Sequence, residues 1–293
     1  MTISSTSINA KLNYESALVN CEWLRQHLDC PDLVILDATY FLPRQQRSAR
    51  EEYNSQHIEG AQFFDIDAIA DRHSPLPHTL SSAEQFGHQV GQLGMDNNTW
   101  IIVYDYNHFF ASARVWWMFR AFGHDQVKVL DGGLTRWKQL AFPLTNEKKS
   151  RSPKIFHAVF RPELFADLAQ MQAIQQQGSA QILDSRSEDS FNGSRPLHEP
   201  GLQPGHIPGS LNIPYQNLFR QDNHRLRPVD QLTQLLSSAT IDCSKPVVTS
   251  CGSGVSAAVL ILALYQMGIP KVPLFDGSWA EWGRRKDVPI EQG

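Results

Sequence analysis

Four short runs of mostly apolar residues recur along the chain, and each has a side chain able to carry charge or react at its last or second-last position. They cover residues 33–38, 100–105, 180–185 and 246–251. Nearly continuous apolar runs of this length are typical of strands buried on both faces of a parallel sheet. We therefore expect each run to form a central strand.

Between these runs the pattern changes from continuous to helical. Residues 83–93 and 229–237 place apolar side chains three and four positions apart, and each segment precedes one of the apolar strands. Strands that alternate with amphipathic helices predict parallel sheets covered by helices on both faces. The predicted fold class is therefore α/β.

The sequence contains an internal repeat. Residues 33–38, 57–61, 100–105 and 131–137 have counterparts at 180–185, 206–210, 246–251 and 276–282, and the offset stays between 145 and 149 residues. Four landmarks in one order indicate a tandem duplication. We expect an N-terminal domain over residues 10–145, a charged linker over 146–156, and a C-terminal domain over 157–293.

Composition narrows the class of protein. The 293 residues are 41% hydrophobic and 19% charged, with a formal net charge of −4. This balance predicts no binding to nucleic acid or to an anionic membrane. No stretch is long and apolar enough to span a bilayer, and residues 1–13 are polar, unlike a secretory signal. Four irregularly spaced cysteines suggest a reducing compartment, so we expect a cytoplasmic protein.

Ionisable side chains stand at the ends of the predicted strands. Asp37 and Asp184 stand at the ends of two equivalent strands, one in each repeat. Cys251 ends another strand of the second repeat, and the equivalent residue in the first repeat is either Asp105 or its neighbour Tyr106. Ligands of open parallel sheets bind beyond the carboxyl ends of the strands. We infer a catalytic C-terminal half and an N-terminal half that has lost the chemistry.

The nucleophile candidate is Cys251, which opens a short loop between a strand and an apolar helix. Backbone N–H groups of such a loop, here from Gly252, Gly254, Val255 and Ser256, favour an anion, and a thiol in that setting reacts as a thiolate. Both glycines are expected to allow a tight turn with positive φ. The alternative is a cysteine that only fills the core.

The chain resembles the two-domain rhodanese family from about residue 23 to 289. The most specific element is the loop C-G-S-G-V-S-A at 251–257, and similar segments lie at 57–61, 205–210 and 276–283. Within the family, uncharged residues at Gly252 and Ser253 are similar to the branch that uses 3-mercaptopyruvate. Thiosulfate-specific members carry charged residues there.

The resemblance implies sulfur transfer through a persulfide on Cys251. The donor would be 3-mercaptopyruvate, with thiosulfate as the alternative, and the acceptor a small thiol, a protein such as thioredoxin, or cyanide. The chemistry requires an activated thiolate and backbone donors, so no metal or organic cofactor is expected.

The resemblance also implies a proton relay of Ser253 and His57. Each has a simpler interpretation: Ser253 as a turn residue that binds its own loop, and His57 as a turn-stabilising residue, since His206 repeats it. No acidic member can be placed, because residues 44–50 contain no Asp or Glu.

Arg186 matches the family arginine that binds the donor's anionic group, and a guanidinium can hold a carboxylate through two parallel hydrogen bonds. A surface or salt-bridged arginine is the alternative. The family's further arginines correspond to Ser190 and Glu199 here. Arg195 is the nearest basic substitute.

Two other classes compete. A cysteine-dependent phosphatase of related fold needs an arginine at the end of the loop, where residues 256–258 are Ser-Ala-Ala. A non-enzymatic rhodanese-type binding module is the remote alternative, and the retained cysteine with its glycines argues against it.

Overall fold

A computed structural model describes residues 16–106, 108–197 and 199–293, so the polar segment 1–13 lies outside the described residues. The chain divides into two compact units. Unit 1 comprises residues up to 69 with 81–160 and 221–226, and unit 2 comprises 70–80, 161–220 and 227–293. Each unit contains one repeat and a short segment of the other. The domain limits at 145 and 157 stay a prediction.

Unit 1 contains one five-stranded sheet in the order β1-β5-β4-β2-β3, with every pair parallel. Its strands are β1 (Leu18–Val19), β2 (Leu33–Asp37), β3 (Ala61–Phe63), β4 (Trp100–Tyr104) and β5 (Val127–Leu130). Its helices are α2 (Cys21–Gln26), η1 (Pro43–Gln45), α3 (Ala49–Ser55), α4 (Ile66–Ile69), α5 (Ala83–Gln92), α6 (Ser112–Ala121) and α7 (Gly133–Gln139).

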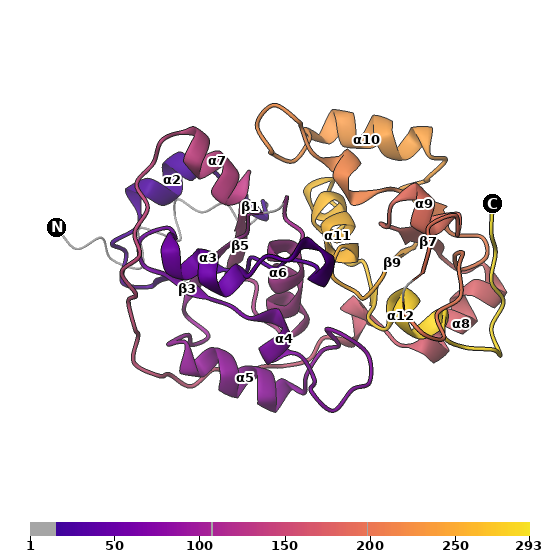
Figure 1. Cartoon of the computed structure of the whole chain (residues 1–293), viewed down its shortest axis with the longest axis horizontal. Helices are drawn as coiled ribbons and strands as arrows, with labels where there is room; N and C mark the ends of the chain where they lie inside the picture. The colour runs from indigo at the N-terminus through magenta and orange to yellow at the C-terminus, as the bar shows by residue number, and fades with distance from the viewer. Residues whose placement is uncertain (1–15, 107, 198) are drawn as a thin grey trace. The chain divides into compact units, whose positions relative to one another are not determined.

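Unit 2 repeats this topology in the order β6-β10-β9-β7-β8, again all parallel. Its strands are β6 (Phe165–Ala166), β7 (Gln181–Asp184), β8 (Leu211–Asn212), β9 (Val247–Ser250) and β10 (Leu274–Phe275). Its helices are η2 (Pro162–Leu164), α8 (Leu168–Gln177), α9 (Glu188–Phe191), η3 (Tyr215–Leu218), α10 (Val229–Ser238), α11 (Ala257–Gln266) and α12 (Ser278–Trp282). The predicted α/β fold, a helix-flanked parallel sheet in each repeat, is confirmed (Figure 1).

The predicted amphipathic helices form within one residue of the expected ends. Ser82 begins α5 by accepting a hydrogen bond from the Gln85 N–H at 3.1 Å, which satisfies one of the free amides of the first turn. Phe86 and Val90 on the buried face of α5 then pack into unit 1. The period read from the sequence thus reports the buried face.

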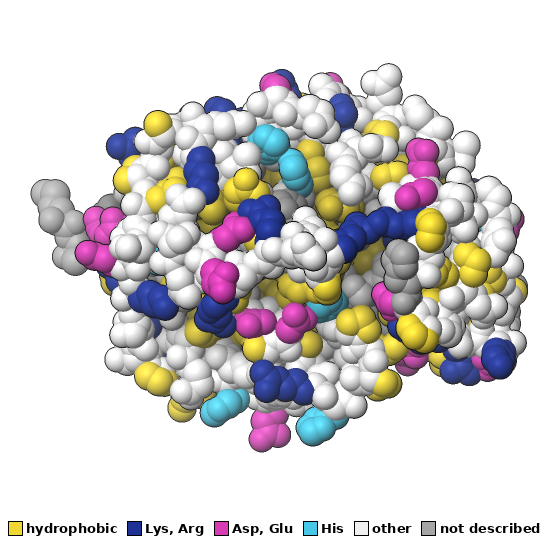
Figure 2. All heavy atoms as spheres, viewed as in Figure 1, with side chains coloured by type: hydrophobic (Ala, Val, Ile, Leu, Met, Phe, Trp, Pro, Cys, Tyr) yellow, Lys and Arg dark blue, Asp and Glu magenta, His cyan; other side chains and the backbone are white. Residues whose placement is uncertain are grey.

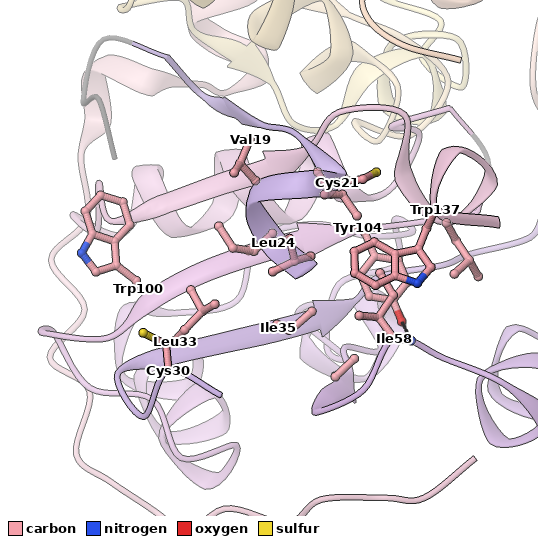
Figure 3. Packing of buried hydrophobic residues seen from close by; sticks show 14 of the residues in the cluster. Val19, Cys21, Leu24, Cys30, Leu33, Ile35, Ile58, Trp100, Tyr104 and Trp137 are labelled. Atoms are coloured by element: carbon pink, nitrogen blue, oxygen red, sulfur yellow. Dashed lines mark hydrogen bonds between the residues drawn. The ribbon is translucent and has the colours of Figure 1, made fainter. Parts of the chain in front are cut away.

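The central strands of both units are buried, as their apolar runs predict. In unit 1, Leu33 and Ile35 of β2 pack with Leu24 of α2 and Trp137 of α7 in one hydrophobic cluster (Figure 3). Unit 2 has a corresponding cluster that includes Val248 of β9. Burial of this apolar surface positions the carboxyl ends of the strands, where the loops of interest begin.

Charges of both signs are distributed over the face drawn in Figure 2, and neither sign covers it alone. Among the described residues, no helix is long and apolar enough to cross a membrane.

Candidate active site

Cys251 follows the last residue of β9, as predicted, and only 1% of it is exposed. Its carbonyl accepts a hydrogen bond from the Trp279 N–H at 2.9 Å, and the Gly252 carbonyl accepts one from the Ala280 N–H at 2.8 Å. Both donors belong to α12. The start of α12 therefore holds the first two carbonyls of the cysteine loop in place.

The same contact in unit 1 identifies the counterpart of the cysteine. The Leu134 N–H of α7 donates to the Asp105 carbonyl at 2.9 Å, as Trp279 does to Cys251. The sequence left Asp105 and Tyr106 as alternatives because the first loop is one residue longer. The hydrogen bond assigns the position to Asp105.

The side chain of Asp105 is surrounded by the loop that follows β4 in unit 1. Its carboxylate accepts backbone hydrogen bonds from Phe109 at 3.1 Å, Ala111 at 3.0 Å and Ser112 at 2.8 Å. Burial raises the pKa of Asp105, and the hydrogen bonds from Ser112, Ala111 and Phe109 oppose that rise. The loop after β4 is therefore a set of backbone donors directed at one anion.

The two glycines of the cysteine loop differ. Gly254 has a φ of +77°, which side chains other than glycine rarely adopt, so the prediction is confirmed there. For Gly252 it is wrong: its φ is not positive, and a Cβ would meet nothing within 4 Å. The turn needs only one glycine because its left-handed residue is at 254. The absent side chain at 252 leaves open space beside the nucleophile.

The remaining loop residues have distinct surroundings. Val255 is buried, and the hydroxyl of Ser256 lies 2.8 Å from that of Ser185, with either oxygen able to donate. Ser253 is half-buried, and no side-chain hydrogen bond of it is found among the described residues. Its hydroxyl is thus not committed to the loop in the way the turn interpretation requires.

Arg186 is fixed by an ion pair two residues away. Its Nε donates to both carboxylate oxygens of Asp184, at 3.1 and 2.9 Å, and its Nη2 donates to one of them at 2.7 Å and to the Gly205 carbonyl at 2.9 Å. Only 10% of the side chain is exposed. The bidentate edge of the guanidinium therefore holds Asp184, and Nη1 makes a longer hydrogen bond on the other side of the group.

Arg186 and Arg195 both donate a hydrogen bond to Ser190. The Ser190 carbonyl accepts from Arg186 Nη1, and its hydroxyl accepts from Arg195 Nη1, each at 3.4 Å. Glu199, by contrast, pairs with Arg284 at 2.6 Å. Arg195 is thus held next to Arg186, and its role as a substitute arginine stays a prediction.

His57 and His206 make parallel contacts in their own units. The Nδ1 of His57 lies 2.7 Å from the Tyr53 carbonyl and its ring stacks on Tyr53, and Nδ1 of His206 lies 2.9 Å from the Phe191 carbonyl with its ring stacked on Phe191. Nε2 of His57 also lies 3.2 Å from the Glu147 carbonyl. These contacts agree with the turn-stabilising alternative, and the relay stays a prediction.

Ser278 is a site residue that the sequence analysis missed. Its hydroxyl accepts a hydrogen bond from the Cys251 N–H at 3.1 Å and lies 4.0 Å from the sulfur. The signal was present in the repeat, because residues 131–133 read Asp-Gly-Gly where 276–278 read Asp-Gly-Ser. Of the two repeats, the one that contains Cys251 carries a side chain there.

Fold and site together define an α/β protein of two repeats, with a cysteine directly after the central strand β9 of the second repeat. The sequence model of the rhodanese-like domain matches residues 20–140 and again 167–285. The chain belongs to the rhodanese family, as the resemblance indicated. Among the described residues, no group of three or more His, Cys, Asp or Glu is arranged to hold a metal ion.

Relatives of known activity match nearly the whole chain. Human 3-mercaptopyruvate sulfurtransferase is 40% identical over 94% of this chain and 95% of its own. The mitochondrial thiosulfate/3-mercaptopyruvate sulfurtransferase 1 of Arabidopsis thaliana is 37% identical over 99% of this chain and 83% of its own. The crystal structure of SseA, a 3-mercaptopyruvate sulfotransferase from Escherichia coli, aligns with a TM-score of 0.83 at 38% identity, covering 91% of this chain and all of that one.

Proposed function

We propose that this chain is a sulfurtransferase that moves a sulfur atom from 3-mercaptopyruvate to a thiol or to cyanide through a persulfide on Cys251. One observation carries the proposal. Cys251 corresponds to Asp105, whose loop directs three backbone N–H groups at an anion. A loop of this kind stabilises both a thiolate and the persulfide anion that replaces it.

The proposed reaction balances without a cofactor. The Cys251 thiolate attacks the thiol sulfur of mercaptopyruvate, an S–S bond forms, and the C–S bond breaks with its electron pair left on the departing enolate. The thiol proton ends on that carbon, which gives pyruvate and an enzyme persulfide. An acceptor thiolate or cyanide then takes the outer sulfur and restores the thiolate.

Arg186 and Arg195 are the proposed ligands of the donor carboxylate. Arg186 offers Nη1, and Arg195 lies beside it at Ser190 with 35% of its side chain exposed. One N–H group from each guanidinium would take the place of a bidentate contact from Arg186 alone, because Asp184 already occupies the bidentate edge of Arg186. The Ser253–His57 relay implied by the resemblance stays a prediction.

Thiosulfate is the second candidate donor, since the Arabidopsis relative's name includes both compounds. Thiolate attack on its outer sulfur would release sulfite and leave the same persulfide. Small thiols and thioredoxin are the proposed acceptors. We also propose a cytoplasmic location, supported by four cysteines that are all free of disulfides, because a thiolate nucleophile needs a reducing compartment.

The test compares the wild type, Cys251→Ser and Cys243→Ser. Pyruvate release from mercaptopyruvate and thiocyanate formation from thiosulfate and cyanide are measured in parallel, and mass spectrometry locates the added sulfur after donor exposure. We expect Cys251→Ser to lose all activity and all added sulfur. Cys243→Ser controls for the loss of a free cysteine that lies elsewhere in unit 2, and it should keep both.

Activity or a persulfide that persists in Cys251→Ser would overturn the proposal. A wild-type protein inactive with both donors would favour the rhodanese-type binding module instead. A wild type that uses thiosulfate and not mercaptopyruvate would keep the persulfide chemistry and change the donor.

A further inference from the structure

Ser278 combines three features that rarely occur together. It is fully buried, its φ is +49°, and its hydroxyl touches the backbone of the proposed nucleophile. A left-handed backbone is costly for a residue with a Cβ, and such residues cluster at functional sites when the surroundings hold them. The backbone conformation alone would favour glycine here.

The first repeat shows the less costly solution. Gly133 occupies the equivalent position in α7 with a φ of +54°, and a Cβ there would meet the Asp105 carbonyl at 2.4 Å. Unit 2 keeps the same conformation and carries a serine in spite of it. The two repeats thus differ at both members of one pair, Asp105 with Gly133 and Cys251 with Ser278.

The hydroxyl of Ser278 connects three atoms. Its oxygen accepts the Cys251 N–H at 3.1 Å, and its proton is directed at the Phe275 carbonyl at 2.8 Å, with the sulfur 4.0 Å away as the other acceptor in range. A hydroxyl proton rotates to the stronger acceptor, and an anionic sulfur attracts a donor more strongly than a neutral thiol does.

We propose that Ser278 is a positioning residue that holds Cys251 through its backbone N–H and supplies a hydroxyl donor to the sulfur when it becomes anionic. This inference rests on the proposed sulfur transfer and adds a residue to it. It explains why the catalytic repeat keeps a buried serine in a backbone conformation for which glycine is better suited.

The test uses Ser278→Ala and Ser278→Gly, with Ser210→Ala as the matched control. Ser210 is a buried serine of unit 2 whose hydroxyl donates to the Ile207 carbonyl at 2.7 Å, so its loss removes a bond of the same kind away from Cys251. Readouts are kcat and KM, the melting temperature, and the pH profile of Cys251 alkylation by iodoacetamide without any sulfur donor.

We expect both Ser278 variants to lower kcat about tenfold with KM changed less than about twofold, as for an interaction made mainly in the transition state. Their alkylation profiles should move to higher pH. Ser278→Gly should melt above Ser278→Ala, because glycine relieves the left-handed backbone, and yet be no more active. Ser210→Ala should keep the wild-type kcat and alkylation profile.

Wild-type kcat and an unchanged alkylation profile in both Ser278 variants would overturn the inference. So would activity that follows the melting temperature across all variants, since that indicates a purely structural role. Alkylation needs no sulfur donor, so it separates a failure of this inference from a failure of the sulfurtransferase proposal, which Cys251→Ser tests.

Discussion

Asp105 and Cys251 occupy equivalent positions in the two repeats: each follows a central strand, and each carbonyl accepts a 2.9 Å hydrogen bond from the helix after the last strand of its sheet. Their side chains differ in chemistry and in the hydrogen bonds that they make. The Asp105 carboxylate accepts hydrogen bonds from the backbone of its own loop, whereas Cys251 carries a thiol at the equivalent position. The equivalent loops therefore differ in the side chain at their first position, which is a carboxylate in unit 1 and a thiol in unit 2.

Replacing Asp105 should destabilise unit 1. Asp105→Ala leaves three buried backbone N–H groups without their acceptor, and one unsatisfied buried donor costs about 1–3 kcal/mol. We expect a loss of about 3 kcal/mol in the free energy of unfolding, measured by urea denaturation. Asp105→Asn, which keeps one carbonyl oxygen, should lose less.

Added sulfate provides the control for this interpretation. A free anion that enters the vacated loop of Asp105→Ala binds the folded state only and raises its melting temperature. The wild-type loop already contains a carboxylate, so sulfate should raise its melting temperature less. Equal stability of Asp105→Ala and the wild type would contradict the assigned role.

Arg195 offers a cleaner test of donor binding than Arg186. Removing Arg186 also unpairs the buried Asp184, which confounds activity with stability. Arg195→Ala should raise KM for mercaptopyruvate about tenfold, a loss of about 1.4 kcal/mol, with a smaller change in kcat. Steady-state kinetics measure both.

Arg284→Ala is the matched control for Arg195→Ala. Arg284 is equally exposed at 35% and pairs with Glu199 in the same unit. Its removal should leave KM within about twofold of the wild type. Similar KM values for the Arg195→Ala variant and the wild type would remove that residue from the site.

His57 and His206 form a natural pair for testing the relay. Both rings stack on an aromatic side chain and place Nδ1 at a backbone carbonyl, so the contacts favour a turn-stabilising role for both. We expect His57→Gln and His206→Gln to lower the free energy of unfolding by similar amounts, about 1 kcal/mol each. Their kcat values should stay within about twofold of each other.

A relay predicts a different outcome. If His57 passes a proton during the reaction, His57→Gln loses kcat by about 100-fold, the contribution typical of general acid–base catalysis, and His206→Gln does not. Kinetics and thermal melts on the two variants distinguish the roles. A selective loss of kcat in His57→Gln would restore the relay.

The sequence could predict the sheets and the position of Cys251 at the end of a central strand because both leave local signals. Continuous apolar runs mark buried parallel strands, and a cysteine before Gly-Ser-Gly marks a loop of backbone donors. Because the sequence repeats, a topology inferred for one half also applied to the other half. The loop lengths differ by one residue, so only the Leu134–Asp105 hydrogen bond could decide which residue matches Cys251.

Long-range contacts left no such signal. Leu226 of the second repeat donates its N–H to Asp131, and Leu80 of the first donates to Asp276, each within one compact unit. These bonds place residues 221–226 with unit 1 and 70–80 with unit 2. No periodicity within either segment reports a partner about 100 or more residues away, because turn-rich segments carry little pattern.

Asp37 predicts a specific pH dependence of stability. It occupies the place of Asp184, and the Thr39 N–H binds its Oδ1 at 2.9 Å as the Arg186 N–H binds Asp184. Unit 1 has Thr39 where unit 2 has Arg186, so the residue two positions after Asp37 offers it no guanidinium. Burial, only partly opposed by hydrogen bonds from Thr39 and Tyr104, raises the pKa of Asp37 to about 6.

The sign follows from linkage. In the unfolded chain Asp37 ionises near the ordinary aspartate pKa of 3.8, and in the folded protein only near 6. The neutral carboxyl therefore favours the folded state below about pH 4, and this contribution is lost as the pH rises to about 6, by up to about 3 kcal/mol. Asp37→Asn cannot ionise and keeps an oxygen for the Thr39 N–H. Its melting temperature should fall less between pH 4 and pH 6.5 than that of the wild type.

Asp29→Asn isolates the effect, because Asp29 is an exposed aspartate of the same unit. Other groups also titrate in this range, so the informative quantity is the difference between the variant and wild-type curves. That difference should grow from pH 4 to pH 6 and then stay constant for Asp37→Asn, and this change should exceed the one measured for Asp29→Asn. Parallel curves for Asp37→Asn and the wild type would mean that water or a neighbouring donor stabilises the Asp37 carboxylate. The absence of an arginine at the position of Thr39 would then not lower the stability of unit 1.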